Sequence, residues 1–190
     1  FHANIFYPTP NSLALTDHMF GLGIFNLPFK LFSDNPWIGY NFLIFLAYLL
    51  SALGGYLLVN QLFRNRLLAF WAGVFWAFLF FRVHHIGHIS ILTFHWIPFA
   101  INYWIKFLRV PTKKFAILFT LFFLLQILTS WYLGVILAFA CMLVAPFYVF
   151  PNIRSRRLWT GLGGMAAIIG AVVWVFGRPY ALNFGTSTMS

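Results

Sequence analysis

Long apolar stretches separated by short basic segments form the main pattern along the chain. A helix needs about 20 apolar residues to cross a bilayer core of roughly 30 Å. Four stretches approach or exceed this length, at 37–63, 67–83, 89–108 and 158–176, and a fifth runs from 115 to 150 without a charge. The pattern predicts membrane-spanning helices.

The fifth stretch decides how many spans are expected. As a single helix its 36 residues would be about 54 Å long at 1.5 Å per residue, which is far more than a bilayer requires. A polar break at 129–132 predicts a turn, with spans at 115–130 and 132–150. We therefore expect an all-α, polytopic transmembrane bundle with about six spans between residues 37 and 176.

The composition excludes most other protein classes. Of 190 residues, 62% are hydrophobic and 7% are charged, and the mean hydropathy is +0.87. This number of charged residues is too small to cover the surface of a soluble domain. Soluble globular, disordered and fibrous proteins are therefore excluded. The single cysteine, Cys141, allows no disulfide within the chain.

The basic residues give the bundle a predicted orientation. The net charge is +10, but the basic residues lie between apolar runs, so we expect the lipid bilayer as a partner and no nucleic acid. Six spans place three basic residues on one side: Lys30, Arg82 and Arg178. The other side holds nine: Arg64, Arg66, Lys106, Arg109, Lys113, Lys114, Arg154, Arg156 and Arg157. We expect the nine-charge side to be cytoplasmic. Its basic residues would only anchor a multi-pass membrane protein.

Two segments are expected on the outer face. Residues 1–36 predict an outer loop with a short interfacial helix, in which Asp17 could cap the helix and Pro28 would end it. Residues 177–190 would begin a second outer segment. Because residue 1 is Phe rather than Met, we expect the chain to be an internal piece of a longer protein.

The strongest candidate for chemistry is a basic cluster near the predicted outer face. Its members are Arg82, His84, His85, His88 and His95. In a helix that continued through residue 87, three of the histidines would share one face. The cluster could bind a phosphate, hold a metal through the His84–His88 pair, or only anchor helix ends. We assign no metal ligands and no definite cofactor, and we leave a divalent metal open.

Two further groups could take part in chemistry. Asp17 and His18 are the candidate catalytic residues, with Asp17 as a general base or, alternatively, as a helix cap. Gln126, Ser130 and Tyr132 lie at the outer end of the fourth predicted span. They could line a binding pocket or hydrogen-bond between helices.

Short motifs follow one another in a recognisable order over residues 1–150. They are Ala3-Asn4-Ile5-Phe6-Tyr7-Pro8, Leu13-Ala14-Leu15-Thr16-Asp17-His18, Asn35-Pro36, Tyr40-Asn41, Phe81-Arg82-Val83-His84-His85-Ile86-Gly87-His88, Trp96-Ile97-Pro98-Phe99 and Gln126-Ile127-Leu128-Thr129-Ser130-Trp131-Tyr132. This series resembles the bacterial polytopic membrane glycosyltransferase-like proteins of the GT-C type, close to the RgtA/B/C/D-like group.

The resemblance implies a polyprenyl-phosphate sugar donor, a location in a bacterial plasma (inner) membrane and an active site on the outer face. The acid or base would deprotonate an acceptor hydroxyl, while Arg82 and the histidines would stabilise the leaving lipid phosphate. Two other hypotheses stay open. One is a transporter or flippase-like protein, although such proteins typically show repeats and helices broken at mid-membrane. The other is a membrane assembly protein without chemistry.

Overall fold

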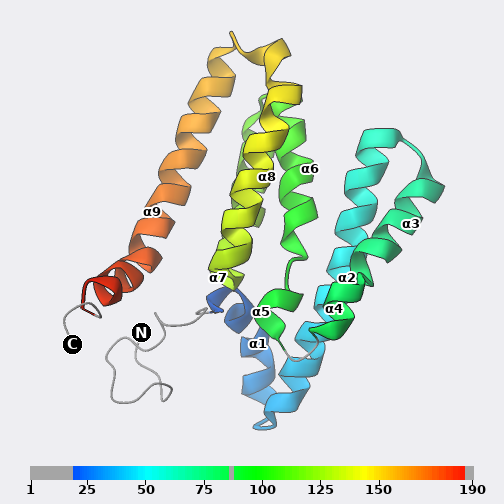
Figure 1. Ribbon diagram of the computed structural model, residues 1–190, viewed down its shortest axis with the longest axis vertical. Helices are drawn as coiled ribbons and strands as arrows, with labels where there is room; N and C mark the ends of the chain where they lie inside the picture. The colour runs from blue at the N-terminus through cyan, green and yellow to red at the C-terminus, as the bar shows by residue number, and fades with distance from the viewer. Residues whose placement is uncertain (1–18, 86–87, 187–190) are drawn as a thin grey trace.

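The computed structural model describes residues 19–85 and 88–186, which form helices and turns with no strand among them (Figure 1). The predicted all-α class is therefore confirmed for this part of the chain. The elements are α1 (Phe20–Phe32), α2 (Pro36–Phe63), α3 (Arg66–Ala77), α4 (Phe80–His84), α5 (Ile89–Leu92), α6 (Trp96–Arg109), α7 (Lys113–Thr129), α8 (Trp131–Val149), the 3₁₀ turn η2 (Phe150–Asn152) and α9 (Arg156–Thr186).

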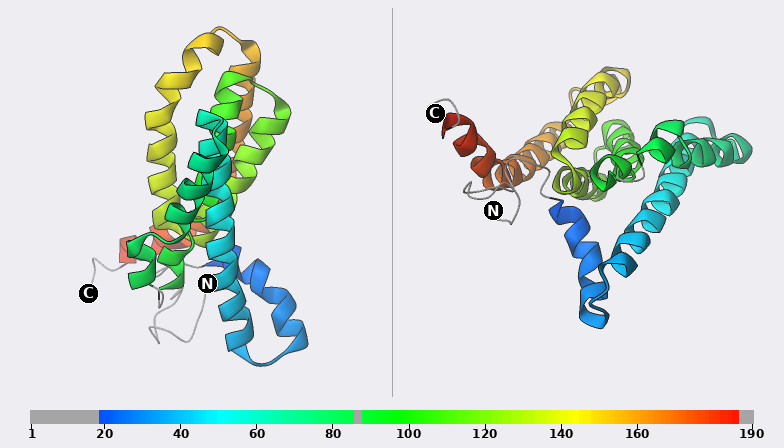
Figure 2. Two further views of the ribbon diagram at one scale, coloured as in Figure 1. Left: turned by 90° about the vertical axis from the view of Figure 1, so that its right-hand side faces the viewer. Right: turned by 60° about the horizontal axis from the view of Figure 1, so that its bottom comes forward.

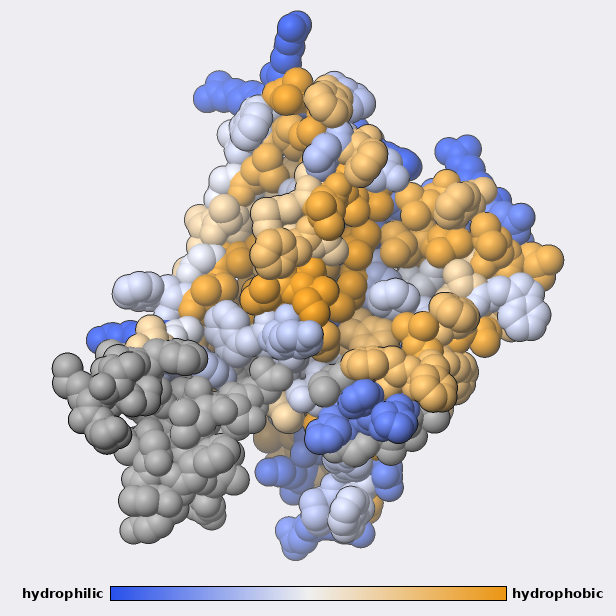
Figure 3. All heavy atoms as spheres, in the orientation of Figure 1, coloured by the Kyte–Doolittle hydropathy of each residue, from blue (hydrophilic) through white to orange (hydrophobic). Residues whose placement is uncertain are grey.

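Three described segments are long and apolar enough to cross a membrane: Pro36–Phe63, Trp131–Asn152 and Arg156–Ala181. The remaining expected spans form shorter helices. α3 has 12 residues, α6 has 14 and α7 has 17. Large apolar side chains cover much of the visible outer surface of the bundle, as expected where lipid replaces water as the solvent (Figure 3).

Helix α6 lies at the centre of the bundle, where α2, α7 and α8 pack around it (Figure 2). Its apolar side chains are almost fully buried. The indole Nε1 of Trp104 donates a hydrogen bond of 2.9 Å to the carbonyl of Cys141, which ties α6 to α8. The Trp104 ring also lies 4.8 Å from that of Phe119 on α7. These contacts fix three helices around one aromatic core.

The predicted helical hairpin within 115–150 is confirmed. α7 ends at Thr129 and α8 begins at Trp131, with Ser130 in an extended conformation between them. The amide of Ser130 donates to the carbonyl of Gln126, and the amide of Gly134 donates to the carbonyl of Ser130. One residue thus ends the first helix and starts the second.

The histidine cluster and α6 do not form one continuous helix, so the expectation that three histidines share one helix face is wrong. α4 ends at His84, α5 covers only Ile89–Leu92, and α6 begins at Trp96. Proline provides part of the reason. Pro98 occupies the first turn of α6, where its missing N–H has no helical partner to lose, so a helix can begin just before it.

The expectation that Pro28 ends the first helix is also wrong, because α1 continues past it to Phe32. α1 packs against α2 and α7, and its predicted position in the membrane interface stays a prediction. The rings of Phe29 and Phe42, for example, lie 4.5 Å apart. These contacts support the helix beyond the position where proline removes one backbone hydrogen bond.

The nine basic residues of the predicted cytoplasmic side all belong to one end of the bundle, at the top in Figures 1 and 3. This end, here called the basic end, contains the α2–α3, α6–α7 and α8–α9 connections. The opposite end, here called the histidine end, contains α4, α5, the α1–α2 turn and the α7–α8 hairpin. The side of the membrane on which each end lies stays a prediction.

Cysteine labelling in intact cells tests the predicted orientation. In a Cys141→Ser background, Asp34→Cys at the histidine end should react with a membrane-impermeant reagent. Ser155→Cys at the basic end should react only after the membrane is opened, because positive residues favour the cytoplasm. Labelling of Ser155→Cys from outside would contradict the orientation.

The close contact of α2 and α3 can be tested at Gly73. A Cβ atom there would lie 2.5 Å from the carbonyl oxygen of Ala52. Gly73→Val should therefore lower the unfolding free energy in mixed micelles by about 1–3 kcal/mol. Gly163→Val is the matched control, since a Cβ at Gly163 has no neighbour within 4 Å. Equal stabilities of the two variants would contradict the close approach.

Candidate functional site

The side chain of Arg82 is fully buried at the histidine end and joins two interrupted helices. Its Nη1 donates a hydrogen bond of 3.2 Å to the carbonyl of Ala77, the last residue of α3. Its Nη2 donates one of 2.8 Å to the carbonyl of Leu92, the last residue of α5. Carbonyls at helix C-termini lack partners within their own helix. Arg82 therefore caps two helix ends with one guanidinium.

Two aromatic rings hold the same guanidinium. Its carbon lies 4.4 Å from the ring centroid of Tyr48 on α2 and 4.7 Å from that of Phe94. A desolvated cation near an aromatic face is stabilised by about 2 kcal/mol. A phosphate clamp or an interfacial anchor needs an exposed guanidinium, and the 0% exposure of Arg82 supports neither interpretation.

Gln126 on α7 binds the next backbone carbonyl after Leu92, in the connection between α5 and α6. Its Nε2 donates a hydrogen bond of 3.2 Å to the carbonyl of Thr93, the residue that follows Leu92. The hydroxyl of Thr93 in turn donates to the carbonyl of Ile89 at 2.9 Å. Of the two interpretations of Gln126, hydrogen bonding between segments is the one that these contacts support.

Unpaired polar atoms lie in the interior around the α5–α6 connection. The Nε of Arg82, the Nδ1 of His95 and the Oε1 of Gln126 are buried and have no hydrogen-bond partner within 19–85 and 88–186. His95 is only 2% exposed, and its ring lies 4.5 Å from that of Trp96. His95 is thus part of the packed interior and is separated in environment from the surface histidines.

Three of the predicted residues form an exposed cluster at the histidine end. His84 and His88 are exposed and His85 is half-buried. The ring centroids of His84 and His85 lie 5.6 Å apart, and those of His85 and His88 lie 6.2 Å apart. The Nδ1 of His85 lies 2.8 Å from the carbonyl of Phe81. Because a carbonyl only accepts, Nδ1 carries the hydrogen, and Nε2 is left to face a ligand.

The remaining predicted residues are placed differently. Tyr132 is 67% exposed in the first turn of α8, whereas Ser130 is buried in the hairpin. Asp17 and His18 lie outside the described residues. Within the described ranges, no group of three or more His, Cys, Asp or Glu side chains is placed to hold a metal ion.

The partners of Arg82 could not be identified from the sequence. Two of them are backbone carbonyls, for which no residue type is diagnostic. The other two are the rings of Tyr48, on a different helix, and Phe94. Tyr48 is one of three tyrosines in the predicted span at 37–63, so the sequence did not single it out.

Comparison with known proteins finds no matching protein-family model, no matching curated protein and no matching solved structure. The resemblance to GT-C glycosyltransferases therefore stays an expectation.

Removing the Arg82 guanidinium tests its structural role. Arg82→Met keeps a long apolar side chain but leaves the carbonyls of Ala77 and Leu92 without their donors. The unfolding free energy should fall by about 2–4 kcal/mol, since each orphaned buried group costs about 1–3 kcal/mol. Arg178→Met, at an exposed position, is the control. Equal stabilities of the two variants in mixed micelles would contradict the role.

Proposed function

We propose that the chain forms the membrane bundle of a GT-C-like glycosyltransferase. It transfers a sugar from a polyprenyl-phosphate donor to an acceptor at the outer face of a bacterial plasma membrane. The proposal includes six crossings, made by α2, α3 with α4, α5 with α6, α7, α8 and α9. The observation that carries it is the exposed group of His84, His85 and His88 at the end opposite nine basic residues.

The histidine cluster suits the charge that develops during sugar transfer. When the bond between the sugar and the lipid phosphate breaks, the departing phosphate gains negative charge. A neutral imidazole donates one hydrogen bond to a phosphate oxygen through its N–H, and an imidazolium donates more strongly. Because the Nδ1–H of His85 already faces the carbonyl of Phe81, His85 donates to a phosphate through Nε2 only in its imidazolium form. The rings of Phe80 and Phe81 lie against those of His84 and His85, at centroid distances of 6.2 and 4.3 Å, which favours one orientation of each imidazole.

Arg82 supports this cluster without touching the donor. α4 has only five residues, which is too short for a helix to be stable by its own hydrogen bonds. The contacts of Arg82 with the ends of α3 and α5 fix α4, and with it His84. Arg82 is thus a positioning residue. Asp17 and His18 stay candidates for deprotonating the acceptor hydroxyl.

The interrupted helices are the observation that makes a transporter or flippase the second candidate function. The chain breaks between α3 and α4 and again between α5 and α6. Transporters use such breaks to expose carbonyls to a substrate or an ion. Here the carbonyls of Ala77, Leu92 and Thr93 already accept hydrogen bonds from Arg82 and Gln126, so they are not free to coordinate cargo. This occupation favours the glycosyltransferase.

Sugar transfer in membrane vesicles tests the proposal, with the complete protein and a radiolabelled polyprenyl-phosphate sugar. Replacing His84, His85 or His88 by Gln should each slow transfer about tenfold, because each removes roughly 1.4 kcal/mol of stabilisation from the leaving phosphate. Lys30→Gln, an exposed cation at the same end, should keep the full rate.

The same vesicles separate the two candidates. Movement of a fluorescent polyprenyl phosphate across the bilayer, without any sugar transfer by the unmodified protein, would favour the flippase. Full transfer by the triple histidine variant would contradict the role of the cluster.

A further inference from the structure

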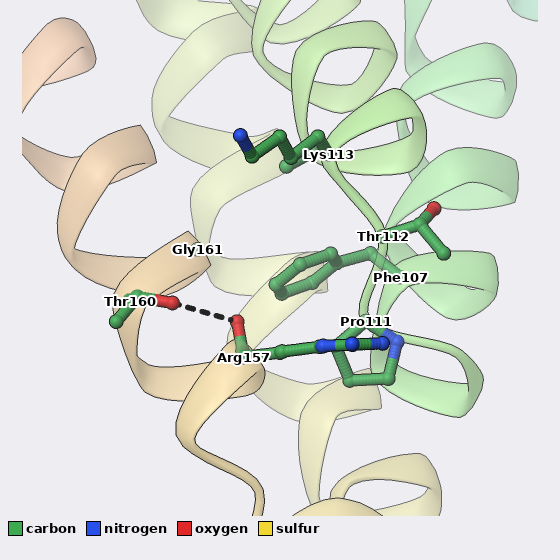
Figure 4. A pocket seen from close by; sticks show the side chains of 8 residues that line it. Phe107, Pro111, Thr112, Lys113, Arg157, Thr160 and Gly161 are labelled. Atoms are coloured by element: carbon green, nitrogen blue, oxygen red, sulfur yellow. Dashed lines mark hydrogen bonds between the residues drawn. The ribbon is translucent and has the colours of Figure 1, made fainter.

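The basic end contains a cavity that continues into an apolar groove. The cavity, of about 510 Å³, lies between the α6–α7 connection and the start of α9 (Figure 4). The groove, of about 440 Å³, lies between α7 and α9. Both are lined by Lys113, Ala116, Thr160 and Gly161, so one continuous depression runs from the polar end into the apolar part of the bundle.

The mouth of this depression carries two cations. Lys113 from α7 and Arg157 from α9 lie on either side of the Phe107 ring, and their charged ends point in opposite directions (Figure 4). Both side chains are exposed and long, so either can turn toward a ligand at the mouth. The only carboxylate side chain that the structure describes belongs to Asp34, in the α1–α2 turn at the opposite end (Figure 1). Neither cation therefore has an acidic side chain beside it in the described part of the chain.

The two nearby hydroxyl groups differ in their hydrogen bonds. The Oγ1 of Thr160 donates to the carbonyl of Arg156 at 3.0 Å. The Oγ1 of Thr112 accepts from the amide of Phe115 at 3.4 Å and keeps its own hydrogen for a further bond. The mouth therefore offers two positive charges and one hydroxyl donor to a ligand. This set suits the oxygens of a phosphate group better than a neutral group.

The groove beyond the mouth is apolar and has a definite length. Ile117, Leu121 and Leu124 line it from α7, and Gly164, Met165 and Ile168 line it from α9. From Lys113 to Leu124 the helix rises by about 17 Å at 1.5 Å per residue. Half of a bilayer core is about 15 Å thick. The groove thus matches the hydrocarbon chain of a lipid from one leaflet.

We infer that this depression binds an anionic phospholipid from the leaflet at the basic end. Its phosphate lies at the mouth, where the side chains of Lys113 and Arg157 can turn toward it, and one acyl chain follows the groove between α7 and α9. A free anion would pair with the two cations but leave the groove empty. A zwitterionic lipid would fill the groove, but its zero net charge would not lower the net positive charge of the mouth. The inference does not rest on the proposed sugar transfer.

Native mass spectrometry of the purified complete protein tests this site. The probes are phosphatidylglycerol, phosphatidylcholine with the same acyl chains, and inorganic phosphate. The unmodified protein should retain phosphatidylglycerol in preference to phosphatidylcholine, and inorganic phosphate should not displace it. Each cation near an anionic headgroup contributes about fivefold in affinity, so the preference should be about 25-fold.

Two pairs of variants separate the headgroup site from the chain site. Lys113→Gln with Arg157→Gln should abolish the preference, whereas Lys114→Gln with Arg154→Gln, which changes the net charge equally, should keep it. Gly164→Leu should weaken binding of both lipids about tenfold by filling the groove. Gly163→Leu is its control. A Cβ at either glycine has no neighbour within 4 Å, and Gly163 does not line the groove.

Three results would overturn the inference. The first is an unchanged preference for phosphatidylglycerol after Lys113 and Arg157 are both replaced. The second is equal lipid binding by the Gly163→Leu and Gly164→Leu variants. The third is displacement of the lipid by inorganic phosphate, which would identify a site for a free anion.

Discussion

The hydrogen bonds of one buried guanidinium allow two helices to end inside the bundle. Away from water, every backbone carbonyl needs a partner within the protein, which normally forces a helix to continue. Arg82 supplies donors to the terminal carbonyls of α3 and α5, and Gln126 supplies one to the next carbonyl along. The short helices between these points, and the histidines that they carry, depend on this arrangement.

The sequence predicted the features that depend on length and charge. The 36 uncharged residues at 115–150 could not form one crossing, and the structure separates them into two helices at Ser130. The sequence could not predict whether the side chain of Arg82 points out of the bundle or into it. An arginine after an apolar run fits an outward, lipid-anchored side chain as well as an inward one. The difference lies in partners that no sequence pattern marks, namely two carbonyls and the rings of Tyr48 and Phe94.

The basic end shows a similar limit. Its residues were expected only to anchor the bundle, because their number alone explains an orientation preference. The cavity between Lys113 and Arg157 arises from the packing of three helices. A Cβ at Gly161 would lie 2.6 Å from the ring of Phe107, so the missing side chain lets α9 approach α6. Such an approach depends on tertiary packing, which the spacing of residues along the chain does not reveal.

The unequal helix lengths have a consequence for the surrounding bilayer. The 28 residues of α2 and the 26-residue candidate span of α9 would be about 42 and 39 Å long, whereas the 14 residues of α6 are about 21 Å long. A bilayer core of roughly 30 Å is shorter than α2 and the α9 span, so these two helices would have to tilt to match it. Only 11% of the most apolar window of α9 is buried, so few contacts fix its angle. In a bilayer, the tilt of α9 would therefore respond more readily to membrane thickness than the buried α6 would.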